Sequence, residues 1–144
     1  MTALTGNIIR QTKGDGTIKS VPVNGGSTIY AGAIVMLDAE RYARPAGSLS
    51  SNGGCIGIAM DKADNAAGSD GAIEVRVWSG LVLLPAASIA QSAVGGTVYA
   101  QDDNQIDETQ GTNEPAAGVL EEVVSSTSGW VRVGTMLEMR ALVS

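Results

Sequence analysis

Two groups of carboxylates come nearest, in residue type and spacing, to a site that could bind a metal. They lie in polar stretches of the chain: Asp61, Asp64 and Asp70 in the first, and Asp102, Asp103, Asp107 and Glu108 in the second. Carboxylate oxygens are typical calcium ligands, but neither group has the ligand spacing of an EF-hand loop. Aspartate is also common in turns, because its side chain bonds the local backbone. We interpret both groups as solvated loops and predict no metal site.

The sequence lacks the side-chain combinations that usually carry out nucleophilic or acid–base catalysis. The chain contains no histidine, which excludes Ser-His-Asp and Cys-His arrangements. The single cysteine, Cys55, stands in an apolar run, where a thiol behaves as an inert small hydrophobe. No carboxylate has the apolar setting that a glycosidase acid needs, and no glycine pair leads into the lysine and helix of a phosphate loop. We predict that the protein is not an enzyme and binds no cofactor.

Two tryptophans remain as candidate contact residues. Trp78 and Trp130 are predicted to occupy equivalent places beside the two Val-Arg-Val segments of the chain. A tryptophan can be the platform of a ligand site, for carbohydrate among others, or the anchor of a protein interface. We expect both residues to lie at an oligomer interface, and a ligand- or carbohydrate-binding β-module is the alternative.

The charge of the chain bears on its partners. The net charge is −6 and the nine Lys and Arg residues are scattered. Binding to phosphate backbones needs several basic residues on one face, so we predict no nucleic-acid partner. No apolar run approaches the length of about 20 residues that spans a bilayer, and the N-terminus lacks the plan of a signal peptide. We therefore expect a protein that is made in a cytoplasm and has no membrane partner.

The segment from residue 53 to residue 85 organises the elements around these residues. Residues 73–78 alternate strictly, with three aliphatic side chains at the odd positions and Glu74, Arg76 and Trp78 at the even ones. This period predicts a half-buried strand. An apolar run at 55–60 precedes it across a polar loop, and another at 81–84 follows and stops at Pro85. The pattern predicts strand, loop, strand, turn and strand.

The same order of parts occurs a second time. Residues 95–100 match 31–36, residues 116–120 match the run around Gly57, and residues 130–134 match 75–77. The chain thus consists of two degenerate halves, which suit a small barrel or sandwich with pseudo-symmetric halves. The alanine-rich run 86–93 is the best candidate for a short helix. We predict an all-β fold with one short helix.

The start of the chain lies outside this repeat. We predict an N-terminal arm at residues 1–23 and a single β domain at residues 24–144. Within the arm, a turn at 14–16 predicts a hairpin of strands 6–13 and 17–21. Because the repeat starts near Gly32, we expect four residues of the arm to contact a partner: Leu4, Ile8, Ile9 and Arg10. The three apolar side chains would then lack a partner inside the chain, and Arg10 would pair with a carboxylate of the partner. The alternative is that Ile8 and Ile9 begin an ordinary outer strand.

The order of these segments resembles the capsid cement, or head decoration, proteins of tailed bacteriophages. The matching segments, with the glycine-containing strands and the Val75–Pro85 region, run roughly from Gly32 to Gly134. The resemblance implies a β-clip or β-tulip-like domain that does no chemistry. Its expected partners are the major capsid protein, on the exterior of the virion, and further copies of itself. The resemblance implies a homotrimer, with a dimer as the alternative, and a role in stabilising the mature shell.

Overall fold

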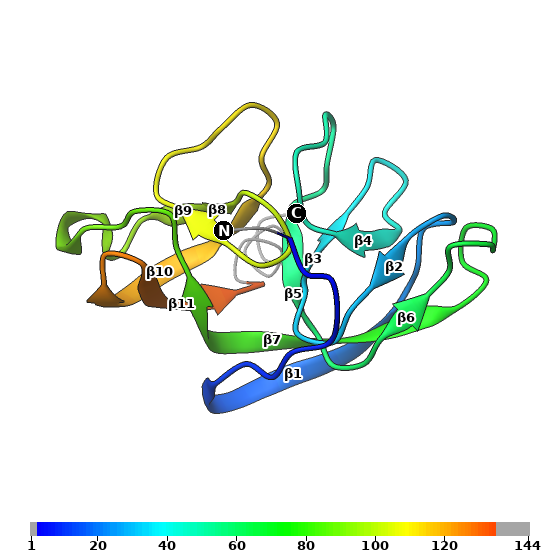
Figure 1. Cartoon of the computed structure of the whole chain (residues 1–144), viewed down its shortest axis with the longest axis horizontal. Helices are drawn as coiled ribbons and strands as arrows, with labels where there is room; N and C mark the ends of the chain where they lie inside the picture. Colours follow the sequence, from blue (N-terminus) through cyan, green and yellow to red (C-terminus); the bar gives the residue numbers. More distant parts are fainter. Residues whose placement is uncertain (1–2, 135–144) are drawn as a thin grey trace, which may run out of the picture.

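The computed structural model describes residues 3–134, and nearly every element in it is a strand. The strands are β1 (Thr12–Pro22), β2 (Thr28–Ile29), β3 (Ile34–Leu37), β4 (Ala43–Pro45), β5 (Cys55–Ala59), β6 (Ala63–Asp64), β7 (Glu74–Pro85), β8 (Thr97–Ala100), β9 (Ile106–Asp107), β10 (Ala116–Ser125) and β11 (Ser128–Val133). Most of them form one strongly curled sheet, and β2 pairs with β6 separately (Figure 1). The all-β prediction is confirmed.

The predicted helix at 86–93 is shorter than expected. Only the 3-10 turn η1 (Gln91–Ala93) forms. Ala86 instead bridges to Ile106, and the Ile89 N–H donates to the Ser126 carbonyl at 2.9 Å. Because these backbone groups bond to distant segments, they are not available for helical hydrogen bonds.

The order of strands in the main sheet confirms the two halves. The sheet runs β4-β3-β5-β7-β11-β10-β8-β9, so each half has the same sequence of neighbours on either side of the β7–β11 pair. Strands β3, β5 and β7 of one half therefore correspond to β8, β10 and β11 of the other. In Figure 1 the second half lies on the left, and β2, β4 and β6 lie on the right.

The ladder register corrects one detail of the repeat. Gly57 pairs with β3 as Gly118 pairs with β8. The residue after Gly57 in β5 pairs with Trp78 of β7. The residue after Gly118 in β10 pairs instead with Arg132 of β11. The prediction that Trp78 and Trp130 occupy equivalent places is therefore wrong. In the observed pairing, residues 130–134 are shifted by two positions relative to the alignment that the sequence motifs predict.

The predicted N-terminal hairpin does not form. Residues 12–22 make one strand, β1, that pairs antiparallel with β7 and shifts register between Lys13 and Thr17. The predicted turn at 14–16 is this irregularity, because the long strand β7 offers β1 a partner on both sides of it. The predicted arm is thus divided, since β1 belongs to the main sheet and only the residues before Thr12 precede it.

Strand β7 connects two apolar cores. The first core consists of Ile34, Met36, Ala46, Cys55, Ile58, Val82, Leu84, Ala86, Ile89, Val98, Ala100, Ile106, Ala117, Leu120, Val131 and Val133. The second core consists of Val23, Ile29, Ala33, Val35, Leu37, Ala43, Ile56, Ala59, Ala63, Val75 and Val77. The predicted alternation is confirmed at the start of β7, where the side chains at odd positions enter the second core. Further along β7, the side chains at even positions enter the first core.

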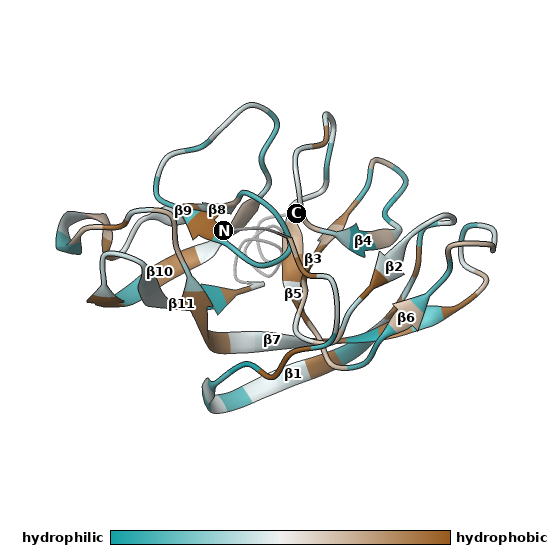
Figure 2. Cartoon of the chain, in the orientation of Figure 1, coloured by the Kyte–Doolittle hydropathy of each residue, from teal (hydrophilic) through white to brown (hydrophobic). Residues whose placement is uncertain are grey.

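Strands β3 and β5 lie between the two cores. Every residue of both strands is buried, and their alternate side chains enter different cores. Figure 2 shows the apolar colours on these strands and polar colours on the projecting loops. The end of β5 and the neighbouring part of β7 form a wall that faces the N-terminal segment.

Candidate functional site

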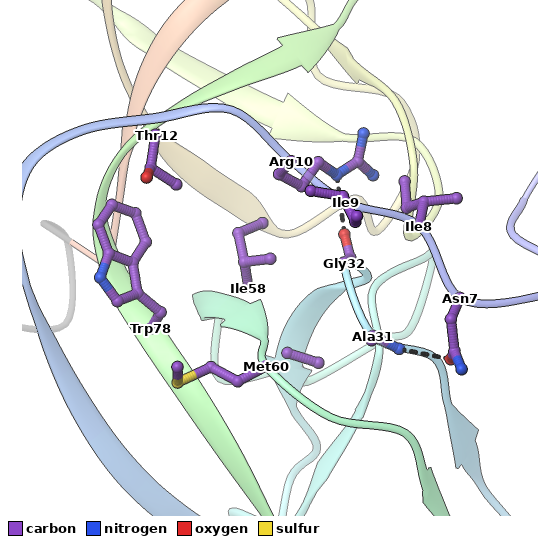
Figure 3. Close-up of a pocket in the computed structure, with 11 residues that line it drawn as sticks. Asn7, Ile8, Ile9, Arg10, Thr12, Ala31, Gly32, Ile58, Met60 and Trp78 are labelled. Atoms are coloured by element: carbon purple, nitrogen blue, oxygen red, sulfur yellow. Dashed lines mark hydrogen bonds between the residues drawn. The ribbon is translucent and has the colours of Figure 1, made fainter.

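An open apolar groove lies between the N-terminal segment and the wall of β5 and β7. Its volume is about 930 Å³, and its lining includes Ile8, Ile9, Ile58, Met60 and Trp78. Figure 3 shows Trp78 on one side, the segment with Ile8 and Ile9 on the other, and Ile58 between them. The Met60 side chain is 38 % exposed. The groove therefore offers apolar surface to an occupant.

Two glycines position the Trp78 indole. A Cβ atom at Gly80 would lie 2.6 Å from Cη2 of Trp78, and a Cβ atom at Gly16 would collide with the same ring. The ring therefore covers the backbone of β7 and of its neighbour β1. It also packs against the first core and is half-buried. One part of the ring is thus fixed by the fold and another part faces the groove.

Leu4 and Arg10 attach the N-terminal segment to the domain. The Leu4 N–H donates to Oδ1 of Asp103 at 2.8 Å, and the Leu4 side chain packs against the second core. Arg10 donates from Nε to the Gly32 carbonyl at 2.8 Å and from Nη2 to Oδ1 of Asn104 at 3.0 Å. The prediction that Leu4 lacks a partner inside the chain is therefore wrong, and Arg10 likewise bonds within the chain.

Ile8 and Ile9 face opposite ways. The Ile8 N–H donates to the Ala31 carbonyl at 2.9 Å, and a Cβ atom at Gly32 would lie 2.5 Å from Cγ1 of Ile8. Ile8 therefore also has a partner inside the chain, contrary to prediction. Ile9 is 99 % exposed, as the arm hypothesis expects. The alternative of a regular outer strand is not observed, since residues 3–11 contain no strand.

Burial sets the electrostatics at this attachment. Desolvation lowers the pKa of Arg10 to about 10, although Asp103 and Asp102 favour its charged form. Burial likewise raises the pKa of Asp103, against the hydrogen bond from Leu4. The Asn7 side chain accepts the Ala31 N–H at 3.0 Å (Figure 3). Because Asn7 and Arg10 are already bonded within the chain, the surface left to an occupant is mainly apolar.

Trp130 offers little surface to a partner. It is 9 % exposed, and Nζ of Lys13 lies 4.2 Å from the centroid of its ring. Lys13 also pairs with Oε1 of Glu122 at 3.7 Å. The structure therefore separates the two tryptophans: Trp78 lines the groove, whereas Trp130 is covered within the chain.

The carboxylate groups and the cysteine serve local structure. Asp61 pairs with Arg76 at 2.7 Å, and this hydrogen bond lowers the pKa of Asp61. Asp102 accepts the N–H groups of Asn104 and Gln105 in a turn. In the described part of the chain, no three His, Cys, Asp or Glu side chains come close enough to hold a metal ion. Cys55 is buried, which raises the pKa of its thiol.

Sequence reasoning found Trp78 and the N-terminal residues but missed the rest of the groove. Met60 and Ile58 were assigned only to an apolar run, and nothing marked Gly16 and Gly80 as the places where an indole lies. The cross-strand pairing of Trp78 with Ile58 brings these residues together. That pairing depends on register, which the sequence pattern alone does not determine.

Comparisons with known proteins do not assign the chain to a family. No family model matches the sequence, and no curated protein or solved structure matches it. Across residues 3–134, no helix has the length and apolar character needed to cross a membrane.

Proposed function

We propose that the protein is a capsid decoration protein, which binds the outer surface of a shell of major capsid protein and stabilises the mature virion. The observation that carries the proposal is the two-half architecture. The segments on which the resemblance to cement proteins rests occur as the strands β3, β5 and β7 and their counterparts β8, β10 and β11. The protein would be made in the host cytoplasm and then join the capsid exterior.

A decoration protein of this kind acts by binding alone. A molecule that binds only the expanded shell stabilises that state by its difference in affinity for the two states. Many copies that each bridge neighbouring subunits gain from multivalency, so each contact can be modest. Carboxylates that cap turns and a buried thiol fit this role, because binding requires no reactive group.

The exposed side of the N-terminal segment is the proposed capsid contact. Leu4, Ile8 and Arg10 hold the segment against the domain. Ile9 is thereby presented to solvent next to the groove. A single exposed aliphatic side chain on a fixed backbone is a suitable anchor for a pocket on a partner, because little conformational entropy is lost on binding.

Self-association belongs to the same proposal. We expect a homotrimer, with a dimer as the alternative, and Trp78 is the better candidate for the interface because Trp130 is covered by Lys13. Light scattering at micromolar concentration measures the state directly. A particle of monomer mass, near 14.6 kDa, at all concentrations contradicts this part of the proposal.

Co-sedimentation with purified capsid shells tests the main proposal. We expect the protein to pellet with expanded shells, and to do so equally after nuclease treatment. The variant Ile9→Asp should lose most of this binding, whereas Thr5→Asp, which places the same charge at another exposed position of the segment, should retain it. Failure of the unmodified protein to pellet with shells, or loss of binding after nuclease treatment, contradicts the proposal.

One observation favours a second candidate function. Trp78 lines an open groove, as an aromatic platform for a carbohydrate would. However, sugar binding also needs polar side chains around the platform, and Asn7 and Arg10 are bonded within the chain. Binding to a glycan array that Trp78→Ala abolishes would favour this function over capsid binding.

A further inference from the structure

Strand β1 has one edge that no other strand covers in the described chain. It pairs with β7 on one side, and among residues 3–134 no second strand pairs with it. In Figure 1, β1 lies at the lower margin of the fold, below β7. The strand is 11 residues long, and positions 12–18 are all exposed. A long exposed edge presents backbone groups to which a further strand can bond.

The register identifies the backbone groups that face outwards. The Val23 N–H donates to the Ile73 carbonyl at 3.0 Å, and this bond continues the register of β1 with β7. Hydrogen-bonded pairs recur at every second residue of an antiparallel ladder, so the odd positions of β1 from residue 17 onwards bond to β7. The N–H and carbonyl groups of Ile18 and Ser20 therefore point away from β7, towards the open edge.

Charged side chains make this edge selective. The side chains of Asp15 and Lys19 form no ion pair with any of residues 3–134. A lysine on an edge strand, and an irregularity such as the register shift between Lys13 and Thr17, oppose indiscriminate strand pairing. The edge therefore favours a strand that places a complementary charge opposite each of these two side chains.

A second copy of β1 carries those charges in the required order. When two β1 strands pair antiparallel about a two-fold axis at Thr17, Asp15 of each copy lies opposite Lys19 of the other. Opposite charges directly across a strand pair stabilise it, and like charges destabilise it. An axis one residue earlier, at Gly16, would instead place Lys13 opposite Lys19. The charges thus favour the axis at Thr17.

The exposed apolar side chain of β1 fits the same register. Ile18 is 53 % exposed and is the cross-strand neighbour of Trp78. With the axis at Thr17, Ile18 of each copy lies opposite Gly16 of the other. The Trp78 indole occupies the space in which a Gly16 side chain would lie. Each Ile18 would therefore contact the indole of the other copy and lose its exposure to water.

We propose that β1 is the interface of a symmetric dimer, in which two copies pair antiparallel along this edge with the axis at Thr17. Such an interface uses the same surface on both copies and closes at two. The inference rests on the self-association in the proposed function, where it favours the dimer over the trimer and places Trp78 at the interface. It does not rest on capsid binding.

Disulfide formation in the full chain tests the register. The two copies of residue 17 would form a pair without hydrogen bonds between them, with Cα atoms about 4.5 Å apart, a distance that a disulfide can span. Thr17→Cys should therefore give a disulfide-linked dimer on mild oxidation. Ser20→Cys is the matched control, because it is exposed on the same strand but lies away from the axis. The unmodified chain should stay unlinked, since Cys55 is buried.

Exchange of charges tests the ion pairs. Lys19→Glu would place like charges opposite each other at both sides of the axis, so the fraction of dimer in sedimentation velocity should fall several-fold. Asp15→Lys with Lys19→Glu restores opposite charges without changing the net charge, and it should restore the dimer. Circular dichroism shows whether each variant is folded.

Three results would overturn the proposal. The first is a disulfide yield for Thr17→Cys no higher than that for Ser20→Cys. The second is a dimer that Lys19→Glu leaves intact, or that the double variant does not restore. The third is a particle of trimer mass without the Thr17→Cys disulfide, which would leave self-association standing but place its interface elsewhere. Failure to pellet with capsid shells, by contrast, would contradict the capsid proposal and not this one.

Discussion

Burial and hydrogen bonding have opposite effects on the pKa of the buried carboxyl group of Asp103. It is 4 % exposed, and it accepts the Leu4 N–H at 2.8 Å. Burial nevertheless raises its pKa, so the charged form is less favourable in the folded protein than in the unfolded chain. A group with a raised native pKa binds more protons when folded, so its contribution to stability falls as pH rises.

Asp103→Asn should therefore stabilise the protein at neutral pH. The amide oxygen can still accept the Leu4 N–H, and the cost of burying a charge is removed. The gain should shrink as the pH falls towards the raised pKa of Asp103, where the carboxyl is protonated in the folded protein. Thermal denaturation at pH 7 and pH 4 measures both effects. Asp15→Asn, at an exposed position of β1, removes the same charge and should change little.

Gly16 is a position where a methyl group has no room. A Cβ atom there would collide with the Trp78 ring. Gly16→Ala should therefore destabilise the protein by about 1–3 kcal/mol, as overpacking does, and should displace the indole. Gly47→Ala is the matched control, since nothing lies within 4 Å of a Cβ atom there. Chemical denaturation gives the free energy of unfolding.

A double-mutant cycle identifies the cause of that loss. In a Trp78→Ala background, Gly16→Ala should cost much less, because the ring that it meets is gone. Equal costs in both backgrounds would show that the backbone of β1, and not the indole, requires glycine at this position.

At the scale of single residues, the sequence identified groups but not their neighbours. Trp78 is conspicuous as one of two tryptophans. The glycines beneath its ring are ordinary turn residues by sequence, and Gly16 meets the ring only because β1 pairs with β7. Local pattern thus indicates which residues can do something, whereas register decides what they contact.

At the scale of elements, predictions from periodicity succeeded where one strand has one buried face. The alternation at the start of β7 is confirmed, because only its odd positions enter a core there. The hairpin at residues 6–21 failed because the glycines at its turn lie within a continuous strand. Strand β7, which pairs with this strand along its length, is distant in sequence. Local turn residues therefore give no indication of that pairing.

Removal of residues 1–10 tests the role of the N-terminal element. Strand β1 begins at Thr12, so the shortened chain should keep its all-β circular dichroism. Its stability should fall, because the hydrogen bonds of Leu4, Ile8 and Arg10 are lost. Each contributes roughly 1 kcal/mol.

Arg10→Gln separates attachment from capsid contact. This variant loses one part of the attachment while Ile9 remains in place, so stability should fall less than after the deletion. An unfolded shortened chain would show that residues 1–10 are part of the core. An unchanged melting temperature would show that the contacts of Leu4 and Arg10 add nothing.

At the scale of the whole molecule, the two halves share strands and do not form separate domains. Side chains of β3 and β5 enter both cores, and β7 pairs with β1, β5 and β11. The sequence predicted the halves because their motifs repeat. It could not predict this sharing, since a repeat is equally compatible with two independent units.

Shared strands predict one cooperative unfolding transition. Leu84→Ala acts in the first core and Ile56→Ala in the second, and both side chains are fully buried. Each substitution should lower the free energy of unfolding by about 2–5 kcal/mol. Because loss of either core removes the support of β5 and β7, the whole protein should unfold at one lowered temperature in each variant.

Scanning calorimetry measures this coupling, because the calorimetric and van't Hoff enthalpies agree only when the molecule unfolds as one unit. We expect a single transition with equal enthalpies in the unmodified chain and in both variants. A second transition that stays at the original temperature in either variant would show that the halves unfold separately. In that case β7 would be a connection between two units, and the groove beside Trp78 would lie at their boundary.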